Sequence, residues 1–130
     1  YLVLSRELGE IETANRAYDT DGVKQSAAGL LAIASSPELK KVAEQIHQAT
    51  LELAGKTTAA QRESFKKLSD GVVKLVGLVS PTPAIANSLY LFHCPMADAD
   101  WIQSEKTIAN PYYSSSMKSC GELVKELKTQ

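Results

Sequence analysis

The strongest constraint on the fold is an apolar stripe at helical spacing in residues 58–79. Its members recur every three or four positions: Phe65, Leu68, Val72, Leu75, Val76 and Val79. Thr58 and Gln61 form a capping-box pattern at the start of the stripe. Pro81 and Pro83 close it, because proline cannot continue a helix. The pattern predicts an amphipathic helix over this range.

Three similar stripes precede it and predict three more helices. They comprise Tyr1, Leu4, Leu8, Ile11 and Tyr18; then Val23, Ala27, Leu30, Leu31 and Ala34; then Leu39, Val42, Ala43, Ile46, Ala49 or Thr50, and Leu53. Residues 19–22 separate the first two stripes. Ser35 or Ser36 is the expected N-cap of the third helix, with Pro37 in its first turn and Glu38 completing a capping box from Ser35. Gly55 is expected to end it.

Short connections between these helices require neighbouring helices to run in opposite directions. The expected fold class is therefore all-α. Residues 1–80 are predicted to form an antiparallel, up-down four-helix bundle, with residues 81–130 as a lobe packed on it. A chain of 130 residues fits a single domain with a core of its own.

Charge and hydropathy exclude two classes of partner. The 14 Lys and Arg residues nearly balance the 15 Asp and Glu residues, and no basic stripe is present to neutralise phosphates, which argues against nucleic acid. No apolar run approaches the roughly 18 residues needed to cross a bilayer. The chain begins at Tyr1 rather than Met, so we expect a mature or trimmed protein whose signal or lipoprotein leader has been removed.

The unusual chemistry is concentrated in the C-terminal lobe. Both cysteines, both methionines and the only tryptophan, Trp101, lie after residue 80. Residues 84–92 are expected to form a short helix that runs into an extended His93-Cys94, because Cys94 precedes a proline. Residues 97–100 are expected to form a turn, and residues 114–127 a short terminal helix capped by serines.

The candidate metal ligands are His93, Cys94, Met96, Met117 and Cys120. Thiolate, thioether and imidazole groups together form a soft set that favours Cu(I) and similar ions over Mg²⁺ or Ca²⁺. On an extended strand Cys94 and Met96 would share a face and His93 would point away. Met117 and Cys120 would share one face of a helical turn. Two such pairs facing each other would form a four-ligand pocket, with His93 at its periphery.

The residue types alone leave three interpretations of the cysteines open. A Cys94–Cys120 disulfide would close a loop of about 27 residues and contribute on the order of 3–4 kcal/mol. A soft-metal site is the second interpretation. Two unrelated buried thiols among core methionines is the third. Two cysteines do not fix a redox compartment.

Catalytic motifs are missing from the sequence. It contains no Ser-His-Asp spacing, glycine-rich phosphate loop, paired-carboxylate motif or HExxH. His93 and Cys94 are adjacent, so on an extended chain they would point to opposite faces rather than form a nucleophile and its base. The sequence favours a binding module over an enzyme.

The lobe resembles a bacterial domain family of uncharacterised function. The resemblance lies in residues 89–97 (LYLFHCPMA), Trp101-Ile102, residues 108–113 (IANPYY), Met117 and residues 120–122 (CGE). Upstream, residues 62–69 (RESFKKLS) are similar to the family's R-x-x-F-x-x-L-S helix. The chain departs from the family at Ser114, where glycine is usual, and in a shortened insert at residues 98–100.

This family occurs as small exported proteins and as the C-terminal part of membrane-fusion adaptors of copper and silver efflux pumps. The resemblance implies an exported protein of the periplasm or outer envelope that binds Cu(I) or Ag(I), with an efflux adaptor or another envelope protein as partner. Cys94, Met96, Met117 and Cys120 then correspond to the motif ligands. Trp101, Asn110, Pro111 and Tyr112 correspond to structural positions. The alternative is a structural or protein-interaction domain without metal whose cysteines form the disulfide.

Overall fold

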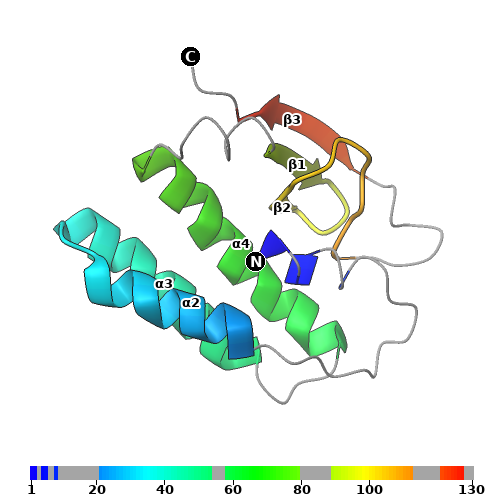
Figure 1. The fold of residues 1–130 in the computed structure, drawn as a ribbon. Helices are drawn as coiled ribbons and strands as arrows, with labels where there is room; N and C mark the ends of the chain where they lie inside the picture. Colours follow the sequence, from blue (N-terminus) through cyan, green and yellow to red (C-terminus); the bar gives the residue numbers. More distant parts are fainter. Residues whose placement is uncertain are drawn as a thin grey trace. The chain divides into compact units, whose positions relative to one another are not determined.

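A computed structural model describes residues 1, 2, 4, 5, 8, 21–53, 58–79, 89–112 and 121–127. These residues form helices α2 (Asp21–Ile33), α3 (Pro37–Leu53) and α4 (Thr58–Leu78), and strands β1 (Tyr90–Cys94), β2 (Ala99–Gln103) and β3 (Glu122–Glu126) (Figure 1). The chain divides into two compact units. One comprises Thr13–Leu78, and the other comprises Tyr1–Glu12 together with Val79–Gln130. No helix in the described ranges is long and apolar enough to cross a membrane.

The predicted all-α four-helix bundle is wrong, because the fold is α+β. Tyr90–Phe92, expected at the end of a helix, lie in β1, and Leu123 and Val124, expected in a terminal helix, lie in β3. Short apolar runs do not distinguish a helix from a strand by periodicity. The aromatic residues of this run suit a strand, and pairing with distant segments decides the outcome. The remainder of both predicted helices, residues 84–88 and 114–120, lies outside the described residues.

The bounds of three predicted helices agree with α2, α3 and α4 to within two residues at each end. The side-chain oxygen of Ser36 accepts a hydrogen bond from the Leu39 N–H at 3.1 Å, and Pro37 is the first residue of α3. Ser36 is therefore the N-cap, and the capping box predicted from Ser35 is wrong. Of the helix predicted over the first 18 residues, the structure describes helical positions only between Leu2 and Leu8.

Helices α3 and α4 pack closely at Gly71. The α3 face that meets the core consists of Val42, Ala43, Ile46, Ala49, Thr50 and Leu53. A Cβ atom added at Gly71 would lie 2.7 Å from the side-chain Cγ1 of Ile46, well inside van der Waals contact. Glycine at this position therefore lets the two backbones approach.

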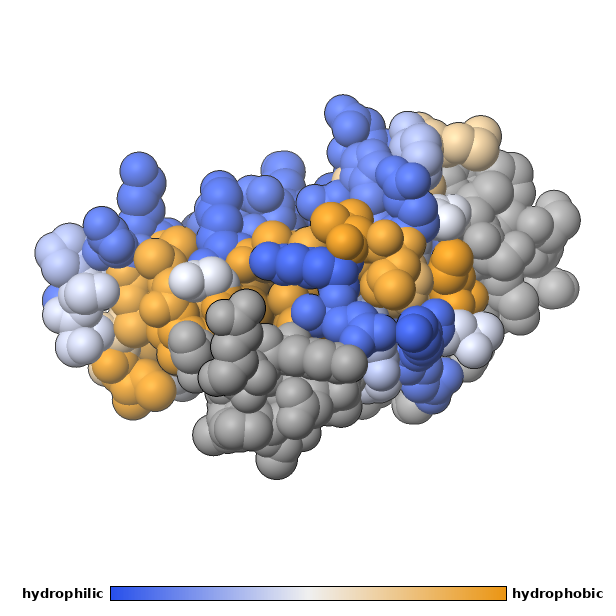
Figure 2. Space-filling model, turned by 90° about the horizontal axis from the view of Figure 1, so that it is seen from above, coloured by the Kyte–Doolittle hydropathy of each residue, from blue (hydrophilic) through white to orange (hydrophobic). Residues whose placement is uncertain are grey.

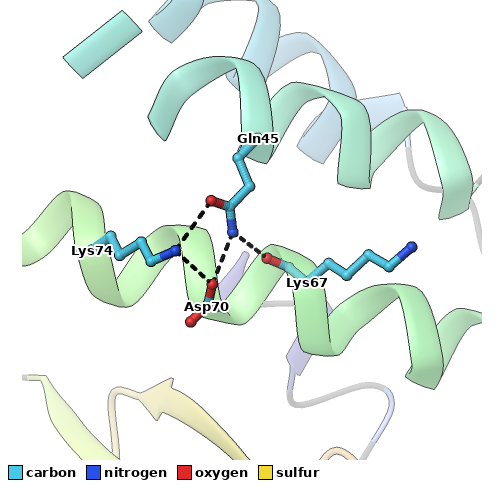
Figure 3. Close-up of polar contacts among 4 residues, drawn as sticks. All are labelled: Gln45, Lys67, Asp70 and Lys74. Carbon is cyan, nitrogen blue, oxygen red and sulfur yellow. Dashed lines mark hydrogen bonds and ion pairs between the residues drawn. The ribbon is translucent and has the colours of Figure 1, made fainter. Parts of the chain in front are cut away.

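A group of polar side chains joins α3 to α4 at the surface (Figure 3). Gln45 donates hydrogen bonds to the Asp70 carboxylate at 3.0 Å and to the Lys67 carbonyl oxygen at 3.4 Å. Lys74 lies 3.0 Å from the same carboxylate and 3.4 Å from the Gln45 side-chain oxygen. Hydrogen bonds from Lys74 and then from Gln45 lower the pKa of Asp70 below its ordinary value.

The sheet is antiparallel with strand order β2-β1-β3. Between β1 and β3 the register shifts at Leu91/Phe92, which pair with Lys125 and Leu123, so that Val124 forms a β-bulge. Two tyrosine hydroxyls form hydrogen bonds with backbone groups of the edge strand β2. The Ile102 N–H donates to the Tyr1 hydroxyl at 3.1 Å, and the Asp100 carbonyl accepts from the Tyr112 hydroxyl at 2.6 Å. These contacts satisfy backbone groups that an edge strand otherwise leaves open.

Several large apolar side chains remain exposed: Leu2, Ile33, Leu51, Leu78, Val79, Met96, Leu123 and Val124. On the face drawn in Figure 2, hydrophobic residues reach the surface in several places beside strongly hydrophilic ones. Single exposed apolar residues are common, so the informative cases are those that cluster on one element.

Substituting Gly71→Ala should lower the free energy of unfolding by about 1–3 kcal/mol, because the new methyl group would overlap Ile46. The matched control is Gly77→Ala in the last turns of α4, where an added Cβ meets nothing within 4 Å. That change should raise stability by up to about 1 kcal/mol. Urea denaturation followed by circular dichroism measures both variants. Changes of the same sign in both would contradict the close packing at Gly71.

Asp70 should make stability depend on pH below its ordinary pKa of 3.8. Its folded-state pKa is lowered, so its contribution is present above pH 3.8 and is lost as the pH falls through the folded value. The effect should be small because the carboxylate is more than half exposed. Asp70→Asn should remove this part of the acid-induced loss of stability in urea titrations at pH 7 and pH 2.5. If the free energy of unfolding of Asp70→Asn changed between pH 7 and pH 2.5 by as much as that of the wild type, this contribution of Asp70 would be ruled out.

Candidate functional site

Strand β1 sends its chemically active side chains to opposite faces of the sheet. Phe92 and Cys94 lie on one face, where the Phe92 ring stacks on Trp101 of β2 with centroids 5.3 Å apart. His93 lies on the other face, opposite Asp100, and its Nδ1 shares a hydrogen bond of 2.6 Å with the Asp100 carboxylate. The sheet therefore separates the His93 ring from the Cys94 thiol.

Cys94 ends β1 as a buried, free cysteine with no exposed surface. Its sulfur accepts a hydrogen bond from the Ala97 N–H at 3.4 Å. Residues 95–98 form the turn to β2, and Asp98 adopts a positive φ of 49° in this turn. Met96, by contrast, is 63% exposed. The predicted extended segment with Cys94 and Met96 on a common face is wrong, because the chain turns directly after Cys94.

The Cys94–Cys120 disulfide, one of the three interpretations that the sequence left open, does not form. Cys94 is a free thiol in this structure, so it takes part in no bridge. Met117 and Cys120 themselves lie outside the described residues. The turn lies at residues 95–98 rather than at the predicted residues 97–100, because Ala99 and Asp100 already belong to β2.

Gly121 lies directly before β3 and allows the chain to pack closely against the β1–β2 pair. It precedes Glu122, which pairs with His93, and it has a φ of +135°. A Cβ atom at this position would lie 2.7 Å from the Trp101 ring and 3.1 Å from the His93 carbonyl oxygen. Only glycine satisfies both the backbone conformation and the space. The residue that precedes Gly121 in the sequence is Cys120, the second candidate thiol.

The four residues predicted to be structural lie together around β2. Trp101 is fully buried, and the Tyr112 ring meets it edge to face at 6.2 Å and 82°. Asn110 is also fully buried, and its side-chain oxygen accepts the Tyr112 N–H at 2.8 Å across the buried Pro111. This Asx turn aims the Tyr112 hydroxyl at the Asp100 carbonyl.

Gln103 is a structural centre that the sequence analysis missed. Its side-chain oxygen accepts the Trp101 indole N–H at 2.8 Å and the Ala109 N–H at 3.2 Å. Its side-chain nitrogen donates to the Glu105 and Thr107 carbonyls, both at 2.6 Å. One amide therefore organises the loop after β2. The sequence spacing could have identified Gln103, because residues 101 and 103 share a face of one strand. A buried indole N–H needs an acceptor, and Gln103 is placed to provide it.

Within the described ranges, no three side chains among His, Cys, Asp and Glu are grouped so that they could hold a metal ion. Comparisons with protein-family models, with curated proteins and with solved structures found no match. The family resemblance and the ligand set therefore stay predictions. The observed features at this end of the sheet are a buried thiol, an exposed thioether and an entering strand fixed by Gly121.

Substituting Gly121→Ala should destabilise the unit that contains the sheet, by more than about 1 kcal/mol, because the new side chain would strain the backbone and overlap Trp101. Trp101 is the only tryptophan, so its fluorescence emission reports directly on this contact. The matched control is Leu123→Ala, which removes a partly exposed side chain from the next strand without a steric overlap. Unchanged stability and an unchanged emission maximum in Gly121→Ala would show that the contact does not form.

Proposed function

We propose that this chain is an exported, envelope-located domain that binds a soft metal ion, Cu(I) or Ag(I), in heavy-metal efflux or resistance. The observation that carries the proposal is the state of Cys94. It is a free thiol at the end of β1, fully buried, and next to a turn that holds a methionine.

The chemistry of this end of the sheet suits a soft ion. Thiolate and thioether groups select Cu(I) over harder cations. The Cys94 sulfur accepts a hydrogen bond from the Ala97 N–H, which fixes the position of this donor at the start of the turn. The exposed Met96 thioether, two residues along the chain, is a second soft donor at the same turn.

The proposed second pair of donors is Met117 and Cys120. Support comes from the path of β3, which pairs with β1 and is positioned against Trp101 and the His93 carbonyl by Gly121. Cys120 directly precedes Gly121 in the sequence. His93 faces the opposite side of the sheet and is held by Asp100, so the proposal leaves it peripheral. The proposed partner that receives or delivers the ion is an efflux adaptor or another envelope protein.

Anaerobic titration of the reduced protein with Cu(I) against a competing chelator tests this function. The wild type should compete for the ion, and Cys94→Ser should lower the affinity by more than the roughly 10–100-fold lost when an outer-shell partner is removed. Met96→Leu, Met117→Leu and Cys120→Ser should each weaken binding. His93→Gln is the matched control, because its ring lies on the other face, and it should leave the affinity unchanged.

Two results would contradict the proposal. Reduced wild-type protein that fails to compete for Cu(I) would exclude a functional soft-metal site. Equal affinities of wild type and Cys94→Ser, with unchanged circular dichroism, would move any binding away from the β1–β2 turn.

A further inference from the structure

The Cys94 thiol has no exposed surface, so neither an ion nor a reagent can touch its sulfur in this conformation. Metal binding through Cys94, the function proposed above, therefore requires a local movement that uncovers the sulfur. Proteins open locally where few buried contacts hold an element in place. The elements next to Cys94 differ strongly in this respect.

The paired strands are the firmly held side. Two residues before Cys94 in β1, the Phe92 ring stacks on Trp101, and both rings are buried. The chain at Gly121 packs against the same indole. Uncovering the sulfur by separating the strands would therefore break the centre of this packing.

The turn of residues 95–98 is the weakly held side. Pro95, Met96 and Asp98 are exposed. Cys94 and Ala99 form the last pair of the β1–β2 ladder, so the turn lies beyond the end of the paired strands. The Ala97 N–H donates to the Cys94 sulfur at 3.4 Å, and sulfur is a weak acceptor. Opening the turn would break this weak bond and leave the aromatic stack in place.

Asp98 provides a way to change the stability of the closed turn. Its φ of 49° lies in the left-handed region, which aspartate tolerates better than most residues with a side chain. Alanine disfavours this conformation, whereas glycine adopts it freely. Two substitutions at one position therefore remove the same carboxylate but differ in their effect on the turn.

We propose that the 95–98 turn is a lid over Cys94, and that a soft ion reaches the thiol when this turn opens, with Met96 as the first ligand it meets. Met96 is 63% exposed, and a thioether has no proton to lose before it binds Cu(I). The identity of the ion rests on the function proposed above. The opening itself is a property of the metal-free protein.

Alkylation by iodoacetamide measures the opening without any metal. In Cys120→Ser protein, Cys94 is the only thiol. Its alkylation should be at least about 10-fold slower than in the urea-unfolded chain. The rate should change little with urea below the unfolding transition, because a four-residue turn exposes little surface when it opens.

Asp98→Ala in the same background should raise the alkylation rate by about 5–10-fold, because alanine disfavours the closed turn. Asp98→Gly is the matched control and should stay within about 3-fold of the parent protein. Equal rates in the two variants overturn the lid. A parent rate as fast as in the unfolded chain, or one that rises with urea as steeply as global unfolding does, also overturns it.

Stopped-flow uptake of Cu(I) by reduced protein with both cysteines tests the entry of the ion. Asp98→Ala should take up the ion faster than Asp98→Gly, by the same factor as in alkylation. Met96→Leu should slow uptake and leave Cys94 alkylation unchanged. Equal uptake by the two Asp98 variants would overturn the role of the turn in ion entry. Absence of uptake in protein whose alkylation behaves as expected would overturn the metal function alone.

Discussion

The unit that contains the sheet depends on the burial of one indole. Trp101 stacks on Phe92 across the β1–β2 pair, meets Tyr112 edge to face and donates its N–H to Gln103. Gly121 admits β3 only because it has no side chain to strike the same ring. Aromatic pairs add to the free energy of burial beyond their area, and a satisfied indole N–H avoids the desolvation penalty of an unpaired donor. All three strands and the loop after β2 therefore share one packing centre.

This packing around Trp101 also determines which side chains lie on each face of the sheet at the end of the β1–β2 pair. The Phe92–Trp101 pair sets the register of β1 and β2, and the register places Cys94 opposite Ala99 on the indole face and His93 opposite Asp100 on the other face. A shift of one residue would exchange the two faces. The separation of thiol from imidazole is thus a property of the strand pairing. The Cys94 thiol and the His93 ring therefore cannot meet at one site while the strands keep this register.

Local signals in the sequence were sufficient for the helices and insufficient for the sheet. The apolar stripe of α4, the serine before α3 with the proline that begins it, and the break before α2 act within a few residues, and the structure confirms those three helices. Strand β3 pairs with a strand about 30 residues earlier, and no local pattern encodes that pairing. Leu123 and Val124 were placed in a helix for this reason. The prediction that Cys94 and Met96 share a face is wrong for another reason. Side chains alternate between the two faces only while the chain stays extended, and Pro95 begins a turn.

Two of the described glycines mark positions where the chain packs most closely. At Gly71 and Gly121 an added Cβ would strike Ile46 and Trp101, so each glycine is required by a contact in the chain. Gly29 and Gly77 differ from them, because an added Cβ would meet nothing within 4 Å, so the space around them does not require glycine although each lowers helix stability relative to alanine.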